Sequence, residues 1–249
     1  MSNDNKIPSN AGKLYPLPAI TPPPHWQGDR TKLQATMQQP TVDEVVAARR
    51  ISQPGSAFNT NRFLFELIVR SIVQLGGQPA SYRDAEQTAT ALGVRVFETW
   101  GEAAKKLCFG GDEAVNDLMR TGKVVGDQVE YTLPKVGPLW GTRSEKDKTF
   151  RWRDPTVGEI IEDSGQDIMG LESYPEDLVG LLSDSQFRRV LRRIVSIGGV
   201  EMTDEDKARW LRQAGPIAYL NIQAMSGMRQ SVPAQERASF LAAIDLDSE

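Results

Sequence analysis

The chain has 249 residues, 39% of them hydrophobic, and its 29 basic and 33 acidic side chains give a formal net charge of -4. This composition is typical of a globular protein, and the slight negative charge argues against the basic surface with which proteins coat nucleic acid. One cysteine and one histidine exclude a disulfide framework, a thiolate-rich metal site and a multi-histidine site. No apolar stretch is long enough to cross a bilayer, and residues 1–5 lack a secretion-signal pattern, so we expect cytoplasmic synthesis and no membrane partner.

Several short segments of the first half of the chain recur in the second half in the same order. Residues 15–18 (Tyr-Pro-Leu-Pro) match residues 131–134 (Tyr-Thr-Leu-Pro). The further matches are residues 39–46 with 154–161, residues 65–77 with 187–199, and Ser81, Asp84 and Gly93 with Thr203, Asp206 and Gly215. Because the order is kept with few changes of offset, the pattern predicts an internal duplication. We therefore expect a disordered tail over 1–12, one repeat unit over 13–122 and a second over 128–249.

Each unit is expected to begin with a short β-hairpin. Residues 128–134 and 149–153 alternate apolar and polar side chains, which is typical of half-buried strands. Residues 31–37 alternate in the same way in the first unit. The prolines at 22–24 predict a stiff loop between the two strands of this unit, because proline cannot donate a backbone hydrogen bond to a neighbouring strand.

Helices are expected to follow each hairpin. Thr41 and Thr156 can cap the first turn of a short helix, and Glu44 and Glu159 lie at the spacing of a capping box. Ser81 and Thr203 are expected to cap a later helix in each unit.

The other predicted helices follow from apolar spacing and from glycine and proline positions. Apolar residues three and four apart predict helices over 61–75 and 184–197, each ended by a Gly-Gly pair. Further helices are predicted over 98–109, 112–119, 217–228 and 233–244. The predicted fold class is therefore α+β and mostly helical, with two tandem copies of a unit made of a short β-hairpin followed by a small helical bundle.

The sequence contains no recognisable set of catalytic residues. It has no Walker loop, no dinucleotide-binding glycine motif and no nucleophile elbow. His25 is expected to be an exposed loop residue, and Cys108, between Leu107 and Phe109, a small buried hydrophobic residue. The acidic residues over 201–206 open a predicted helix, where they favour the helix dipole without a metal. We predict that the protein is not an enzyme and has no catalytic residue, no cofactor and no metal.

Four arginines form a predicted basic face on the helix over 184–197. Arg188, Arg189, Arg192 and Arg193 lie opposite its apolar stripe. With the Gly-Gly pair and the next helix, they resemble a helix-turn-helix, so a DNA-associated regulator is the alternative function. The matching positions of the first unit keep only Arg70 as a basic residue, and a solvated face or a contact with an acidic protein is therefore preferred over nucleic acid.

Three tryptophans lie in or beside turns and strands rich in proline and glycine. Trp26, Trp140 and Trp152 are candidates for interface anchors, because large aromatic side chains contribute strongly to protein binding. Packing of these rings on their own helices is the alternative. Together with the four arginines they are the candidate partner-binding residues.

Residues 149–161, Thr-Phe-Arg-Trp-Arg-Asp-Pro-Thr-Val-Gly-Glu-Ile-Ile, resemble the strand-to-helix junction of the small tail assembly and baseplate assembly proteins of contractile-tailed and long-tailed bacteriophages. The resemblance is clearest in the second unit and reaches the first through the repeat. It implies a non-enzymatic tail assembly chaperone or minor baseplate component that binds phage tail or baseplate proteins. It also implies a place in the host cytoplasm during assembly, or in the virion tail or baseplate. The two units in one chain depart from the pattern of these proteins and leave both roles open.

Overall fold

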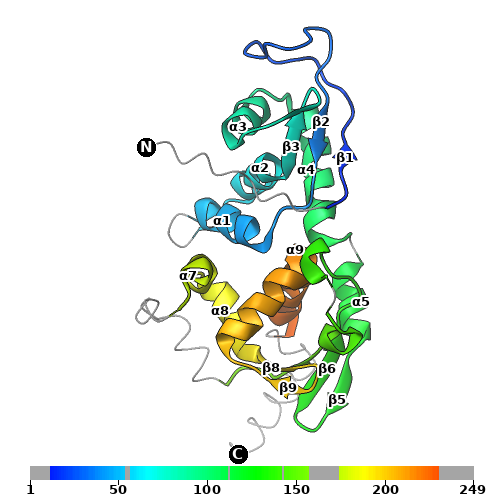
Figure 1. Cartoon of the computed structure of the whole chain (residues 1–249), viewed down its shortest axis with the longest axis vertical. Helices are drawn as coiled ribbons and strands as arrows, with labels where there is room; N and C mark the ends of the chain where they lie inside the picture. Colours follow the sequence, from blue (N-terminus) through cyan, green and yellow to red (C-terminus); the bar gives the residue numbers. More distant parts are fainter. Residues whose placement is uncertain (1–11, 54–56, 112, 142, 157–173, 230–249) are drawn as a thin grey trace, which may run out of the picture.

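A computed structural model describes residues 12–53, 57–111, 113–141, 143–156 and 174–229 (Figure 1). Over these residues the fold is mixed α+β, with about half of the chain in helices and two small antiparallel sheets. The first sheet has the strand order β1-β2-β3-β4 and the second the order β5-β6-β7-β8-β9. The predicted α+β class is therefore confirmed. Residues 1–11 of the tail predicted over 1–12, the helix start after Thr156 and the helix over 233–244 lie outside the described residues.

The strands are short and the helices of moderate length. The strands are β1 (Tyr15–Pro16), β2 (Ala35–Met37), β3 (Ile72–Leu75), β4 (Gln78–Pro79), β5 (Lys123–Val125), β6 (Gln128–Thr132), β7 (Thr149–Trp152), β8 (Ile194–Ile197) and β9 (Val200–Glu201). The helices are α1 (Val42–Ser52), α2 (Thr60–Ser71), α3 (Tyr82–Thr90), α4 (Val94–Phe109), α5 (Ala114–Arg120), α7 (Glu176–Leu182), α8 (Ser185–Arg193) and α9 (Asp204–Arg229), with 3₁₀ turns η1 (Pro138–Trp140) and η2 (Glu145–Lys148). The hairpin predicted over 128–134 and 149–153 forms as β6 and β7.

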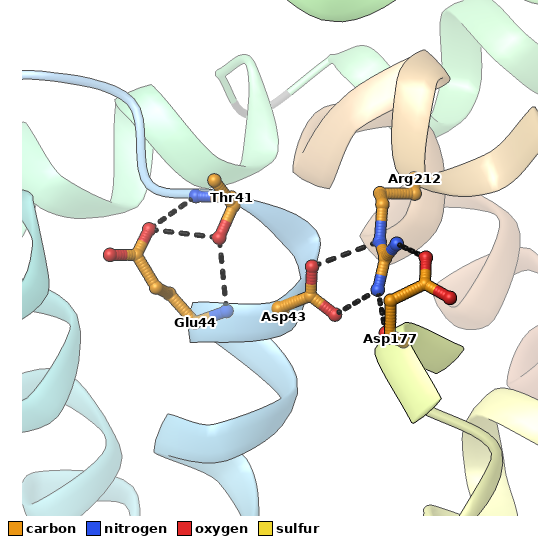
Figure 2. Close-up of polar contacts among 5 residues, drawn as sticks. All are labelled: Thr41, Asp43, Glu44, Asp177 and Arg212. Carbon is orange, nitrogen blue, oxygen red and sulfur yellow. Dashed lines mark hydrogen bonds and ion pairs between the residues drawn. The ribbon is translucent and has the colours of Figure 1, made fainter. Parts of the chain in front are cut away.

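The predicted caps form at the starts of α1, α3 and α9. The Glu44 N–H donates to Thr41 Oγ1 (3.2 Å), and the Thr41 N–H donates to the Glu44 carboxylate (2.6 Å), which completes a capping box (Figure 2). Ser81 and Asp84 form the same box at α3. Thr203 Oγ1 accepts from the Asp206 N–H (3.2 Å). These side chains satisfy backbone donors that a helix start otherwise leaves unpaired.

The helices predicted over 61–75 and 184–197 are too long. Each ends before a β-branched pair, and the residues that follow form strands β3 and β8. Gly76 and Gly77 have φ of +56° and +79°, and Gly198 and Gly199 have φ of +60° and +84°. Two successive positive φ values give the two-residue turn that suits a hairpin. The prediction was wrong because these glycines turn a hairpin instead of ending a helix, and the apolar pattern runs unbroken from helix into strand.

The central strand pairs of the two sheets share an irregular register. In both pairs the register shifts by one residue near the end of the strand. The pairs on either side of the shift are Ala35 with Leu75 and Met37 with Ile72 in the first sheet, and Phe150 with Ile197 and Trp152 with Ile194 in the second.

The matched segments 15–18 and 131–134 do not occupy equivalent positions in the two sheets. Tyr15 pairs with Met37 of β2, whereas Tyr131 pairs with Phe150 of β7, and Val129 takes the place opposite Trp152. The two Tyr-x-Leu-Pro segments are therefore two residues out of register with each other. That particular match is wrong as a structural correspondence.

Helix α9 packs against helices from both halves of the chain. It contacts α1 and α4 as well as α5, α7 and α8 (Figure 1). Gly215, with φ 89° and ψ 173°, interrupts the helix just before Pro216. The buried apolar residues of the described part form one continuous cluster from the first sheet to the second. None of the described helices is long and apolar enough to span a bilayer.

Candidate functional site

An apolar groove opens between α2, α4, α5 and α9. It has a volume of about 450 Å³, and an adjoining hollow of about 250 Å³ shares its three phenylalanines. We call the two together the phenylalanine groove. Its apolar lining residues are Phe58, Phe63, Leu64, Leu67, Phe109, Val115, Leu220 and Ala224. A pocket of this size with an aromatic lining is typical of a binding site.

Phe58 and Phe63 flank the first turn of α2. Asn59 caps this helix by accepting a hydrogen bond from the Arg62 N–H (2.9 Å). Phe58 directly precedes the cap and Phe63 lies four residues after it, which is the spacing of a hydrophobic staple. Their ring centroids are 5.4 Å apart, yet Phe58 is 46% exposed. The staple therefore fixes the position of an aromatic side chain whose outer face remains open to the groove.

The far wall of the groove is set by the end of α4. Gly110 ends this helix with φ 81°, and its N–H donates to the Lys106 carbonyl (3.0 Å). The amide of Asn221 on α9 donates to the Phe109 carbonyl (3.3 Å). A Cβ on Gly101 would lie 2.8 Å from a methyl carbon of Leu64, so any side chain here would require Leu64 to move.

The rim of the groove carries more basic than acidic side chains. Lys105, Lys106 and Arg49 lie along it, with Glu102 as the acidic residue. Glu102 pairs with Lys105 (2.7 Å). The charges around this apolar site therefore favour a partner with acidic residues beside its apolar surface.

The groove has little to offer catalysis. Among the described residues, its lining contains no histidine, cysteine or serine, and the titratable side chains there are the four of the rim. In the part of the chain that the structure describes, no three His, Cys, Asp or Glu side chains lie together as a metal site. What these residues can do is bind an apolar surface.

A buried carboxylate lies on α2, outside the lining of the groove. Glu66 is buried between Arg62 (2.6 Å) and Arg70 (3.4 Å), each one helical turn away. Tyr82 of α3 donates its hydroxyl to Glu66 (2.9 Å), and burial together with this hydrogen bond raises the pKa of Tyr82 to about 12. These bonds connect α3 to α2 and give Glu66 a structural role.

The tryptophans are mostly core residues. Trp152 is 1% exposed and packs edge-on to Phe150, and Trp140 is 7% exposed and packs edge-on to Trp210. Of the two alternatives that the sequence left open, packing in the core is the one found for Trp140 and Trp152, because other aromatic rings of the second half of the chain cover both. Trp26 is half-buried against Gly76.

The arginines of α8 do not form an open basic face. Arg193 is 3% exposed, donates to Ser226 and lies over the Trp152 ring, 5.7 Å from its centroid. Arg188, Arg189 and Arg192 are half-buried. The expected helix-turn-helix is wrong, because the β8–β9 hairpin lies between α8 and α9. Because Arg193 is buried, it cannot contribute to a partner-binding surface.

The remaining predictions concern single residues. His25 is exposed in the loop before β2, and Cys108 is fully buried on α4, as predicted. Burial raises the pKa of the Cys108 thiol well above its usual range. Asp204, Glu205 and Asp206 begin α9, as predicted, whereas Glu201 lies in strand β9. The groove itself was missed, although the aromatic spacing around Asn59 was visible in the sequence.

A second polar cluster connects the two halves of the chain. Arg212 of α9 pairs with Asp43 of α1 (Nε–Oδ2, 3.0 Å) and with Asp177 of α7 (Nη1–Oδ2, 2.8 Å) (Figure 2). Burial alone would lower the pKa of Arg212, but the two carboxylates raise it. The two carboxylates therefore keep Arg212 protonated, and their ion pairs with it join α9 to α1 and to α7.

Comparison of the chain with protein-family models, with curated proteins and with solved structures gave no match.

Proposed function

We propose that the protein acts without catalysis, by binding other proteins through the phenylalanine groove, and that it serves phage tail or baseplate assembly as a chaperone or minor component. The groove is the observation that carries the binding role. The resemblance of residues 149–161 to tail and baseplate assembly proteins supports the setting. The partners are then tail or baseplate proteins, met in the host cytoplasm or in the virion.

The shape and chemistry of the groove favour a helical partner segment. Peptide helices dock by inserting apolar side chains from one face into an apolar groove. Aromatic residues in such grooves dominate the binding energy. Phe58, Phe63 and Phe109 provide three of them around one opening, and the basic rim favours acidic residues beside the inserted face.

Crosslinking mass spectrometry in phage-producing cells that contain the chain tests this proposal. We expect Lys105 and Lys106 at the rim to crosslink to a tail or baseplate protein. Phe58→Asp is expected to abolish these crosslinks, because it places a charge in the groove. Val124→Asp is the matched control, since Val124 is an exposed apolar residue (81%) on the edge strand β5. Crosslinks that persist in the Phe58 variant, or that lead only to proteins outside the tail, would overturn the proposal.

We also propose that the chain arose by duplication of one unit. The shared register shift of the two central strand pairs and the two Gly-Gly hairpins support this origin. The displaced pairing of Tyr15 and Tyr131 limits the correspondence to the central strands. Exchange of residues 72–79 with residues 194–201 tests it. A duplicated hairpin should be accepted in either place, with cooperative urea unfolding retained; loss of cooperative unfolding would count against duplication.

A further inference from the structure

The phenylalanine groove lies beside the end of the described chain. Leu220, Gln223 and Ala224 on α9 line one side of it, and α9 ends at Arg229. At about 1.5 Å per residue, Ala224 lies only about 7.5 Å along the helix from that end. Residues 230–249 continue from this point, outside the described residues.

The sequence of this terminal segment matches the chemistry of the groove. A helix is predicted over 233–244, beginning with Pro233, which suits the first turn. Phe240, Leu241 and Ile244 fall on one face of that helix. The segment thus has the apolar face that helix-in-groove docking requires.

The charges of the segment are opposite to those of the groove rim. Four acidic residues and one basic residue occur in or beside the predicted helix: Glu236, Asp245, Asp247 and Glu249 against Arg237. The rim has three basic residues and one acidic residue, Arg49, Lys105, Lys106 and Glu102. Opposite charges beside an apolar contact favour the correct pairing and the orientation of the two surfaces.

The connection is long enough for the segment to return to the groove. Residues 230–232, if extended, span about 10 Å, and connections of two to eight residues commonly join antiparallel helices. A helix that turns back after Arg229 would run beside α9 and past Ala224. It would then reach the phenylalanines from the open side.

We propose that residues 233–244 dock as an amphipathic helix into the phenylalanine groove of their own chain. The docked segment covers Phe58, Phe63 and Phe109 and places its acidic residues toward Lys105 and Lys106. The docking needs no partner, so it stands apart from the proposed function.

Hydrogen exchange of the full-length chain, followed by mass spectrometry, tests the docking. We expect amides within 234–244 to exchange at least about tenfold more slowly than in an unstructured peptide of the same sequence. Phe240→Ser with Leu241→Ser should remove this protection. These changes leave every described residue unaltered, and urea unfolding of the variant checks that the described core remains folded. Val124→Ser on β5 is the control and should leave the protection unchanged.

Charge reversal provides a second, independent measurement. Lys106→Glu should weaken the protection of 234–244, and Asp245→Lys with Asp247→Lys in the same chain should restore it. Lys106 is exposed, and its contact at the end of α4 is made by its backbone carbonyl, so the reversal leaves that cap in place.

Three results would overturn the proposal. The first is exchange of 234–244 at the unstructured rate in the wild-type chain. The second is protection that survives Phe58→Asp in the groove. The third is protection that rises with protein concentration, because the segment would then occupy the groove of a second copy. All three results are read from the hydrogen exchange of 234–244 and not from partner crosslinks. Absence of crosslinks to tail or baseplate proteins, with this protection intact, would therefore refute the proposed function and leave the docking standing.

Discussion

Arg212 of α9 and Asp43 of α1 form an ion pair with 3.0 Å between Nε and Oδ2, although 169 residues separate them in the chain (Figure 2). Nη2 also donates a hydrogen bond to Asp43 Oδ1 (3.1 Å), whereas Nε makes no hydrogen bond. The hydrogen bond adds direction to the attraction between the two charges. The pair therefore sets how the first helix of the chain lies against the last one described.

We expect the pair to contribute measurable coupling to stability. A double-mutant cycle of Asp43→Asn and Arg212→Gln should give a coupling energy of about 1 kcal/mol, which is modest because Asp43 is partly exposed to solvent. Urea unfolding of the four proteins measures it. Asp177→Asn is the comparison, since it removes the other carboxylate of the cluster. Additive effects of Asp43→Asn and Arg212→Gln would show that the pair contributes nothing.

The break in α9 depends on a close approach of two glycines. Gly215 lies in a backbone region open essentially to glycine alone, and a Cβ there would lie 3.0 Å from the Gly137 Cα. We expect Gly215→Ala to lower the free energy of unfolding by about 3 kcal/mol. Gly199→Ala, which has positive φ but no atom within 4 Å of the added carbon, should cost about 1 kcal/mol. Equal urea midpoints for the two variants would contradict the steric part of this account.

Local signals predicted the starts of the helices better than their ends. Thr41, Ser81 and Thr203 each precede a helix, because a hydroxyl cap and an acid three residues later act within one turn and depend little on the rest of the fold. The change from α2 to β3 was not predicted from Ile72 and Val73. A strand exists there only because β2 lies beside it, and that neighbour is distant in sequence.

The site was harder to predict than the fold, for the same reason. Phe58 and Phe63 are close in sequence, but the groove forms only when Phe109 and Leu220 are brought beside them by α4 and α9. The sequence left open whether the tryptophans are core residues or interface anchors, because a ring in a proline- or glycine-rich segment can still be covered by a distant helix. Trp140 is covered in this way by Trp210 of α9.

Because Trp140 and Trp152 are buried, their replacement should affect folding before it affects binding. We expect Trp152→Ala to lower the free energy of unfolding by about 3 to 5 kcal/mol, with Trp140→Ala close behind. Trp26→Ala should cost less, because this ring is only half-buried. Thermal and urea unfolding give the order. Trp152→Ala with a wild-type midpoint would return this residue to the candidates for a binding surface.

Cys108 should make stability depend on pH above neutrality. Burial, with a smaller contribution from the nearby Glu44, raises the pKa of its thiol in the folded chain. The unfolded thiol titrates near its ordinary pKa of about 8.5. As pH rises above that value, the unfolded chain loses the proton while the folded chain keeps it, so the free energy of unfolding falls by up to about 1.4 kcal/mol per pH unit.

This stability is fully present below about pH 8.5, and Cys108→Ala should lack the decline. The difference between the two proteins isolates the thiol from tyrosines and lysines that titrate in the same range. Urea midpoints of both proteins at pH 7, 8, 9 and 10 measure it. A thiol reagent gives an independent check, because the buried Cys108 should react only at the rate at which the chain opens. Equal pH slopes for the two proteins, or rapid stoichiometric labelling of the native chain, would show that the thiol is accessible and titrates normally.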